Sequence, residues 1–403
     1  MGKPKIRFKG YADDWEQRKL SEVAKKTYGG GTPRTSEEAF WNGRIPWLQS
    51  ADLIEHEVLS AMPKKGITDA GLQNSAAQLI PKNSIAIVTR VGVGKLAFMP
   101  FEYATSQDFL SLCNLNIDGK FGCYVLYRLL QKEKNLTQGT SIKGITKEEL
   151  LNKELLVPKQ QEQVQIGKYF STLDHLITLH QRKCDETKKL KKYMLQKMFP
   201  QNGEKVPKIR FAGFSDDWEQ RKFSELYVRS SEKNDGSIGM DKNITVATMQ
   251  FKEDVQVSTA EYLKTYYTFN LGDIAFEGHQ SKEFRYGRFV ENDIGNGIVS
   301  HIFAVFRPIQ EYDLYFWKYA INNETLMQRI LGRSTKASTM MHDLVANDFL
   351  NETFLVPSID EQKQIGSLFN KLDHLITLHQ QKCDELQNIK KFMLKNMFNR
   401  KNV

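Results

Sequence analysis

Two segments of this chain occur twice, and the stretches between the copies do not repeat. The fourteen-residue phrase LDHLITLHQRKCDE at 173–186 returns at 372–385 with a single change. An internal repeat of this kind indicates that one structural frame is used twice. Each half therefore has a repeated beginning, a unique middle and a repeated end. The beginnings cover 4–23 and 207–226, the middles 24–154 and 227–353, and the ends 155–199 and 354–398.

The repeated ends are predicted to be long helices. Pro158 and Pro357 mark their starts, and apolar residues then recur in alternating steps of four and three, which is the spacing of a coiled-coil seam. Only two such helices are predicted, so the simplest partner of each is the other, and antiparallel pairing suits the short connection between the halves. The predicted seam is Ile166, Phe170, Leu173, Ile177, His180, Cys184, Thr187, Leu190, Met194 and Met198, with Ile365, Phe369, Leu372, Ile376, His379, Cys383, Leu386, Ile389, Met393 and Met397 in the second copy.

The unique middles differ in sequence but have a similar pattern. At 83–99 and 272–290 each has a short apolar strand, a polar or basic loop and another strand. We predict an α+β fold with two pseudo-symmetric globular α/β domains joined by two long helices that form an antiparallel coiled coil. The predicted boundaries are 1–155 for the first domain, 156–200 for the first helix, 201–354 for the second domain and 355–403 for the second helix.

Composition limits the classes of function. The 57 Lys and Arg residues exceed the 48 Asp and Glu residues, and the resulting charge of +9 favours a polyanionic partner. No apolar run is long enough for a membrane span or a signal peptide. Four scattered cysteines do not form a disulfide framework. The expected location is the cytoplasm.

The repeated helices also keep polar residues identical, which seam packing alone does not require. Recent duplication is one explanation, but it should have left the middles alike as well. The other explanation is that both helices present one surface to two copies of a partner. The candidate docking residues are Asp174, His175, Thr178 and Gln181, with Asp373, His374, Thr377 and Gln380 in the second copy.

Two histidine and cysteine pairs lie on the predicted seams. His180 and Cys184, with His379 and Cys383, have spacing that zinc ligands can use on crossing helices. Seam thiols beside satisfied histidines are the favoured interpretation, so no metal site is predicted.

The chain has no recognisable catalytic motif. The glycine-rich stretch RVGVGKL at 90–96 is not a phosphate-binding loop, because Thr89 and Leu96 occupy the positions where that motif needs Gly and Ser or Thr. Polar and basic loops recur in both middles instead. Arg and Lys reach guanine edges, Gln reaches adenine, and Ser and Thr bind phosphate, so these loops favour duplex recognition. The candidate DNA-binding residues are Arg34, Thr35, Gln49, Ser50, Arg90, Lys95 and Lys143, with Gln280, Ser281, Lys282, Arg285, Arg288, Arg333 and Lys336 in the second middle.

Several motifs together resemble a known family, the DNA-specificity subunits of type I restriction-modification systems. WEQRKLSEV and WEQRKFSEL open the two halves, GGGTPRTSEEAFWNGRIPWLQSADL lies at 29–53, and LVP, EQ, QIG and LD recur at 156–177 and 355–376. The second middle lacks the GTP and WNGRIPW signature, so it is similar to a different subtype of recognition domain.

The resemblance implies a non-catalytic reader of double-stranded DNA. Each target-recognition domain would read one half of a bipartite site, and the helices would set the unread spacer. They would also dock two copies of a DNA adenine methyltransferase subunit, and a motor-nuclease subunit would join to cleave unmodified DNA. No cofactor is expected in this chain, whereas S-adenosylmethionine, ATP and Mg are expected in the partner subunits.

Two other interpretations remain open. A coiled-coil scaffold with two protein-binding ends would also explain the repeats, with the basic charge incidental, and the salt dependence of DNA binding separates it from a reader. A nuclease or methyltransferase that acts alone is disfavoured by the missing motifs.

Overall fold

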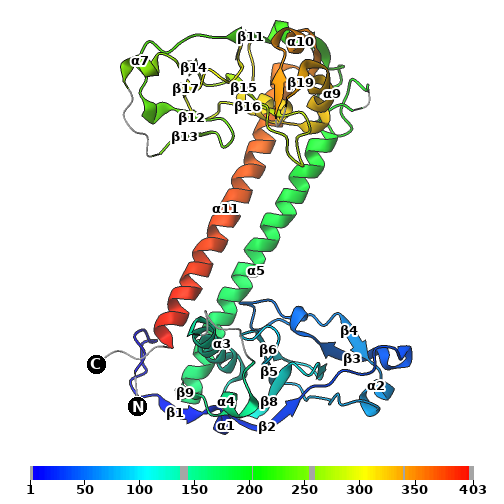
Figure 1. Cartoon of the computed structure of the whole chain (residues 1–403), viewed down its shortest axis with the longest axis vertical. Coiled ribbons are helices and arrows are strands. Elements are labelled where there is room, and N and C mark those ends of the chain that lie inside the picture. The colour runs from blue at the N-terminus through cyan, green and yellow to red at the C-terminus, as the bar shows by residue number, and fades with distance from the viewer. Residues whose placement is uncertain (1–2, 137–143, 202, 254–258, 339–340, 399–403) are drawn as a thin grey trace. The chain divides into compact units, whose positions relative to one another are not determined.

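The computed structural model describes residues 3–136, 144–201, 203–253, 259–338 and 341–398. The chain divides into two compact units. Unit 1 comprises Met1–Gln181 with Gln380–Val403, and unit 2 comprises Arg182–His379. Both repeated helices, α5 (Gln160–Lys197) and α11 (Ile359–Met397), contribute to both units (Figure 1).

Unit 1 is built around a four-stranded antiparallel sheet with the strand order β2-β8-β5-β6. Because successive side chains of a strand point to opposite faces, Ile85 and Ile87 enter one core while Ala86 and Val88 enter another. The first core is shared with Phe121 and other residues of α3. The elements before α5 are β1 (Glu16–Lys19), α1 (Leu20–Val23), β2 (Ala24–Gly29), β3 (Trp41–Leu48), η2 (Ser50–Asp52), β4 (Lys65–Ile67), α2 (Asp69–Gln73), β5 (Ser84–Val88), β6 (Leu96–Met99), β7 (Ala104–Thr105), β8 (Phe109–Leu115), α3 (Gly119–Leu136), α4 (Lys147–Leu151) and β9 (Glu154–Val157), with the turn η1 (Glu38–Phe40) before β3.

Unit 2 has a four-stranded antiparallel sheet with the order β11-β18-β15-β16. Ile274 and Phe276 enter one core, and Ala275 enters another. The elements before α11 are β10 (Glu219–Lys222), α6 (Phe223–Leu226), β11 (Tyr227–Ser230), η3 (Met240–Lys242), β12 (Ile244–Thr245), β13 (Gln250–Phe251), α7 (Ala260–Leu263), β14 (Tyr267–Phe269), β15 (Ile274–Glu277), β16 (Arg288–Glu291), β17 (Gly297–Val299), β18 (Val305–Pro308), α8 (Leu314–Ile321), α9 (Glu324–Ser334), β19 (Thr335–Ala337), β20 (His342–Leu344), α10 (Ala346–Asn351) and β21 (Thr353–Val356).

The two central sheets have the same arrangement although their sequences do not repeat. The short ladders formed by the repeated segments also agree in register, since Glu16 lies opposite Val157 and Glu219 opposite Val356. The expectation that the middles share a fold is confirmed for these sheets. The smaller sheets differ, with β4-β3-β7 in unit 1 and the pairs β12-β13, β14-β17 and β19-β20 in unit 2.

By position along the chain, the order in both sheets is first, fourth, second, third: the last strand lies between the first and the second, and the third is an outer strand paired with the second alone.

The two long helices pair antiparallel in each unit. In unit 1 the first half of α5 lies beside the second half of α11: Ile166 shares a core with Met397, and nearer the helix middles the Cys383 thiol donates to the carbonyl of Ile177 at 3.4 Å. In unit 2 the arrangement is reversed, and the Cys184 thiol donates to the carbonyl of Ile376 at 3.8 Å. The predicted antiparallel pairing is therefore confirmed within each unit.

Matched polar contacts fix the start of each long helix. Arg7 forms a two-fold contact with Glu162, with both N···O distances at 2.7 Å, and Arg210 does the same with Glu361 at 2.8 Å. Each carboxylate is almost fully buried, so its charge needs this partner. Gly167 provides close approach nearby, because a Cβ there would lie 2.8 Å from the Asp118 carboxylate. These contacts explain why the repeated beginnings and ends occur together.

The predicted seam is wrong at one step in each helix. Leu190 is 49% exposed and Ile389 is 36% exposed, whereas the neighbouring Lys390 is buried and Lys191 is half-buried. Each lysine reaches an aspartate of the other helix, so a cation takes the position that apolar spacing assigns to a hydrophobic residue.

The same lysines correct the expectation that Asp174 and Asp373 face outward. Lys390 lies 2.5 Å from Asp174, and Lys191 lies 2.6 Å from Asp373. Tyr124 donates to Asp174 at 2.7 Å and Tyr319 donates to Asp373 at 2.6 Å. Internal packing therefore accounts for the identity of the two aspartates.

Candidate nucleic-acid interface

In unit 1, three loops leave from one edge of the four-stranded sheet. β2 ends at Gly29, opposite Leu110 near the start of β8, and β5 ends at Val88, opposite Phe109. Because antiparallel neighbours run in opposite directions, the segment after β2, the segment before β8 and the β5–β6 loop all lie where these strands end, on one side of the sheet. We call this set of strand ends and loops the unit 1 loop edge.

Hydrogen bonds tie the β5–β6 loop to its neighbours. Thr89 donates its N–H to the carbonyl of Asp108 at 2.7 Å, and the Lys95 ammonium donates to the carbonyl of Ser50 at 3.1 Å. Ile145, just after the predicted contact Lys143, donates to the carbonyl of Thr89 at 2.8 Å. These segments border a cavity of about 510 Å³, which is lined by Glu55, Arg90, Val91, Gly92, Val93, Lys95 and Gly144.

The structure thus brings Ser50, Arg90 and Lys95 together, and Gln49 lies beside Ser50 as the residue that precedes η2. Lys143 itself lies outside the described residues. No partner of the Arg90 guanidinium is found among the described residues, and Arg90 is exposed. Its charge is available to a ligand.

Arg34 and Thr35 are exposed on the segment that follows β2. The carbonyl of Arg34 accepts the indole N–H of Trp41 at 3.0 Å, which fixes the backbone and leaves the guanidinium in solvent. Thr32, just before them, donates to the amide oxygen of Gln107 at 2.6 Å in the segment before β8. The two predicted residues therefore belong to the same loop edge.

Unit 2 has a loop edge at the equivalent place. β15 ends at Glu277, opposite Arg288 at the start of β16, and β11 ends at Ser230, opposite Val305 at the start of β18. The β19–β20 hairpin joins this edge, since His342 donates its backbone N–H to the carbonyl of Gly278 at 2.8 Å.

The predicted residues of unit 2 separate into two groups. Two of the cations are held by carboxylates: Arg288 by Glu277 at 2.8 Å, and Arg333 by Glu352, a hydrogen bond that raises the pKa of Arg333. The others are exposed at the edge, although several have local contacts there: Gln280 bonds to His342, and the Ser281 hydroxyl accepts N–H groups of its own turn. The remaining exposed residues are Lys282, Arg285 and Lys336.

Comparison with known proteins bears on these two edges. The family model for the type I restriction modification DNA specificity domain matches twice, over residues 12–189 and 215–388. This chain belongs to that family. Each match contains one loop edge and the start of one long helix, so the chain carries two specificity domains.

Two specificity subunits are similar to this chain over part of its length. The MjaIX specificity subunit of Methanocaldococcus jannaschii is 26% identical over 46% of this chain and 42% of that protein. The EcoR124I/EcoR124II specificity subunit of Escherichia coli is 31% identical over 43% of this chain and 44% of that protein. The matched stretch thus spans less than half the length of either relative.

Solved structures show the same fold over nearly the whole chain. The type I restriction-modification S subunit from M. genitalium has a TM-score of 0.62 at 15% identity, covering 99% of this chain and all of that one. A second structure, described as a study of complex assembly and conformational transition of the type I R-M system, has a TM-score of 0.50 at 13% identity and covers 96% of this chain and 98% of that one.

The predicted docking residues on the helices of this specificity chain are in varied surroundings. His175, Thr178 and Gln181 are exposed on α5, and His374 and Thr377 are exposed on α11. Gln380 is half-buried and donates to Asp384 at 3.1 Å. Their role in docking stays a prediction.

Sequence reasoning missed a second set of surface residues on the same helices. They are apolar and exposed, and they recur at equivalent positions of the two helices. When Cys184 and Cys383 are assigned to the a position of the heptad, these residues fall at the c and g positions. In an antiparallel pair the g flanks of both helices lie on one side. Unit 1 has Leu179, Ile389 and Phe392, and unit 2 has the counterparts Leu378, Leu190 and Tyr193 with Leu375 in addition. Repetition of apolar character outside the seam was the available signal.

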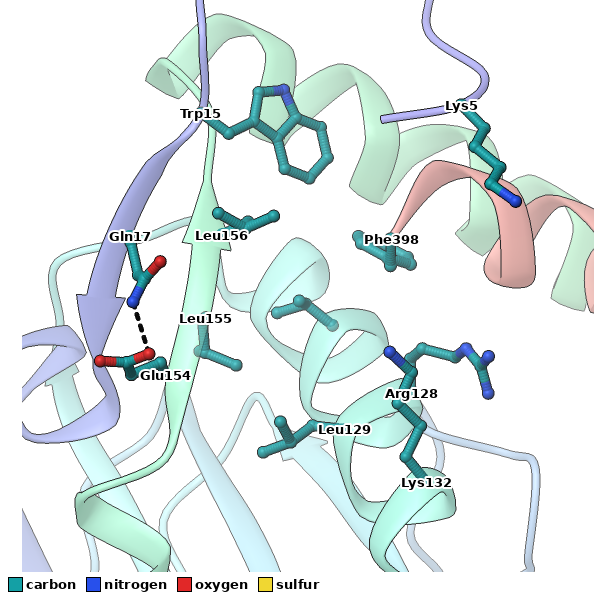
Figure 2. A pocket seen from close by; sticks show the side chains of 11 residues that line it. Lys5, Trp15, Gln17, Arg128, Leu129, Lys132, Glu154, Leu155, Leu156 and Phe398 are labelled. Carbon is teal, nitrogen blue, oxygen red and sulfur yellow. Dashed lines mark hydrogen bonds between the residues drawn. The ribbon is translucent and has the colours of Figure 1, made fainter. Parts of the chain in front are cut away.

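A second cavity in unit 1, of about 550 Å³, is drawn in Figure 2. Figure 2 shows an apolar lining that includes Phe398 and Leu155, with Lys5, Arg128 and Lys132 around it. Burial and the neighbouring Arg128 lower the pKa of Lys132. Because α3 and β9 do not belong to the loop edge, this cavity is not part of the candidate interface.

The described residues contain no group of three or more His, Cys, Asp or Glu side chains arranged to hold a metal. Cys184 and Cys383 instead lie against backbone carbonyls of the other helix. Within the same residues, no helix is long and apolar enough to cross a membrane.

Proposed function

We propose that this chain reads a bipartite double-stranded DNA target as the non-catalytic specificity subunit of a type I restriction-modification complex. One unit would read each half-site through its loop edge. The observation that carries the proposal is the pair of equivalent loop edges on one sheet arrangement, each with exposed cations and each with its own sequence. A shared frame with different loops is what two different half-sites require.

The exposed cations suit the two tasks of a reader. Arg34, Arg90 and Lys282 can contact phosphates, which position a protein on the duplex, or guanine edges, which specify sequence. The proposed site of action is the cytoplasm, since the substrate is cellular DNA.

The long helices would dock two copies of a DNA adenine methyltransferase subunit, and a motor-nuclease subunit would complete the complex. S-adenosylmethionine, ATP and Mg would bind those partners. The repeated apolar residues support two copies of one partner, because Leu179 and Leu378 are exposed at equivalent positions, as are Tyr193 and Phe392.

The reader role is tested by co-expression with the methyltransferase subunit of the same operon, followed by sequencing of host DNA for N6-methyladenine. A bipartite motif should appear, and exchange of residues 227–353 for those of another specificity subunit should change one half only. A stable complex that methylates no new motif would favour a protein-binding scaffold instead.

Docking is tested by native mass spectrometry of the complex. Leu179→Glu should remove one methyltransferase copy, and Leu179→Glu with Leu378→Glu should remove both. Val164→Glu is a matched control, because Val164 is exposed on α5 but its repeat counterpart is Lys363. Retention of both copies by the double variant would exclude this surface.

A further inference from the structure

We propose that Val91 in unit 1 and Ile302 in unit 2 each contact the 5-methyl group of a thymine in their half-site. This inference rests on the proposed function and names the base feature that each loop edge recognises. Val91 is 71% exposed and Ile302 is 74% exposed. Single exposed aliphatic residues are common on protein surfaces, so their position, and not their exposure alone, carries the argument.

Val91 lies in the β5–β6 loop between Arg90 and Gly92 and lines the cavity of the unit 1 loop edge. The loop is held at both ends, because Val88 donates to the carbonyl of Lys95 at 3.0 Å and the Lys95 ammonium donates to Ser50. Gly92 and Gly94 have φ values of +94° and +100°, which glycine adopts readily and other residues do not. The valine is therefore presented on a fixed backbone beside the exposed Arg90.

Ile302 lies just before β18, at the loop edge of unit 2. Phe303 donates its N–H to the carbonyl of Ser300 at 3.1 Å, which closes a turn around the isoleucine. Phe276 donates to the carbonyl of Ala304 at 3.0 Å, so this turn lies alongside the end of β15. The β15–β16 loop that begins there contains the exposed Lys282 and Arg285.

The two units thus reach the same combination from different loops. Each has a β-branched aliphatic side chain in solvent at a loop edge that also carries exposed cations, where the proposed DNA would lie. In the major groove, thymine alone presents a methyl group, and apolar side chains are its natural contact. Polar base edges would lose hydrogen bonds to water against valine or isoleucine.

An aliphatic residue can also act as a wedge between base steps in the minor groove. A wedge acts on stacking and is insensitive to the thymine methyl group, whereas the proposed contact needs it. Deoxyuridine differs from thymidine by that methyl group alone, so it separates the two modes.

The experiment uses the complex with the methyltransferase subunit, after its methylated motif has been determined. Duplexes carry deoxyuridine in place of one thymidine at a time, and equilibrium binding is measured. We expect one substitution in each half-site to weaken binding about fivefold, the scale of one buried methyl group. Val91→Ala should remove this sensitivity in one half-site and Ile302→Ala in the other.

Val164→Ala serves as a control, because Val164 is 48% exposed and lies on α5, away from the loop edges. This variant should bind like the unaltered chain. Deoxyuridine sensitivity that persists in Val91→Ala and Ile302→Ala would overturn the inference, as would half-sites without any A·T pair. Absence of a methylated motif in the unaltered complex would instead count against the proposed function.

Discussion

Units 1 and 2 use one frame for two different surfaces. The frame repeats down to single contacts: Arg7 with Glu162 corresponds to Arg210 with Glu361, and Tyr124 with Asp174 corresponds to Tyr319 with Asp373. The loop edges share neither sequence nor the small sheets around them. Contacts that hold the rest of each unit to the long helices are kept, and residues at the loop edge are free to differ.

The units also differ inside the frame. Four and eight residues after Tyr124, α3 carries Arg128 and Lys132, which line the cavity in Figure 2. The corresponding positions after Tyr319 are Asn323 and Met327, and Met327 is buried in the core of unit 2. The chain breaks into α8 and α9 there, whereas α3 is continuous. Unit 2 therefore has a polar amide and a buried methionine where unit 1 keeps two cations at a cavity.

The largest expected effect tests whether the frame is equivalent in both units. Arg7→Met and Arg210→Met each leave a nearly fully buried glutamate without its cation, which should cost about 3 kcal/mol in either unit. Hydrogen exchange resolved by peptide measures the loss of protection in each unit. Arg182→Met, which removes an exposed pair with Glu186, should change little. Unequal losses from the two arginines would break the equivalence.

A smaller effect should distinguish the units. Lys390 contacts Asp174 and the Tyr124 ring and also donates to the carbonyl of His56 at 2.8 Å, whereas Lys191 has only the equivalent contacts, with Asp373 and the Tyr319 ring, among the described residues. Lys390 is also the more buried lysine. We expect Lys390→Met to destabilise unit 1 by about 2 kcal/mol and Lys191→Met to destabilise unit 2 by about 1 kcal/mol. The free energy of unfolding of each unit is measured by hydrogen exchange at increasing denaturant concentration. A larger loss for Lys191→Met than for Lys390→Met would contradict this expectation.

The repeated frame was predictable from sequence, and the loop edges were predictable only in part. Identity between the repeats fixed the helices, their pairing and the presence of two related domains. The seam was misassigned at Leu190 because a lysine that is neutralised by an aspartate of another element has no periodic signal. For the same reason the sequence pattern could not distinguish Arg288, whose charge is paired with Glu277, from Arg90, which is exposed. Pairing across distant segments is a property of the folded chain.

A buried carboxyl group provides a pH-dependent contrast between the units. Glu291 lies opposite Ile274 in β15, whereas Phe98 occupies the matching place opposite Ile85 in β5. Burial, followed by the charge of Asp293, raises the pKa of Glu291 well above its usual range, and neither carboxyl oxygen has a hydrogen-bond partner among the described residues. A group whose pKa is raised in the folded state contributes its full stability at pH values below its pKa in the unfolded chain, which is about 4.3 for Glu. That contribution is lost as the pH rises toward the pKa of the folded state.

Glu291→Gln should therefore stabilise unit 2 at neutral pH, by about 1 kcal/mol, and the gain should grow as pH rises from about 4.3. The measurement is the thermal midpoint of both proteins across this range. Phe98→Leu in unit 1 is a control that should add no pH dependence. A constant difference between Glu291→Gln and the unaltered chain would show that Glu291 does not titrate as its burial implies.

The smallest effect concerns how each loop edge would meet DNA. Arg90 is exposed and Arg288 is already neutralised by Glu277 and bound to the carbonyl of Ala247 at 2.7 Å. If phosphate contacts follow free charge, Arg90→Gln should lower the slope of log affinity against log salt by about 1, and Arg288→Gln should leave it nearly unchanged. The measurement is binding of the methyltransferase complex to its target at several salt concentrations. The slope reports the ions released on binding and does not depend on protein stability. An equal change of slope in both variants would therefore mean that DNA displaces Glu277 from Arg288. The two loop edges would then present their cations in the same way.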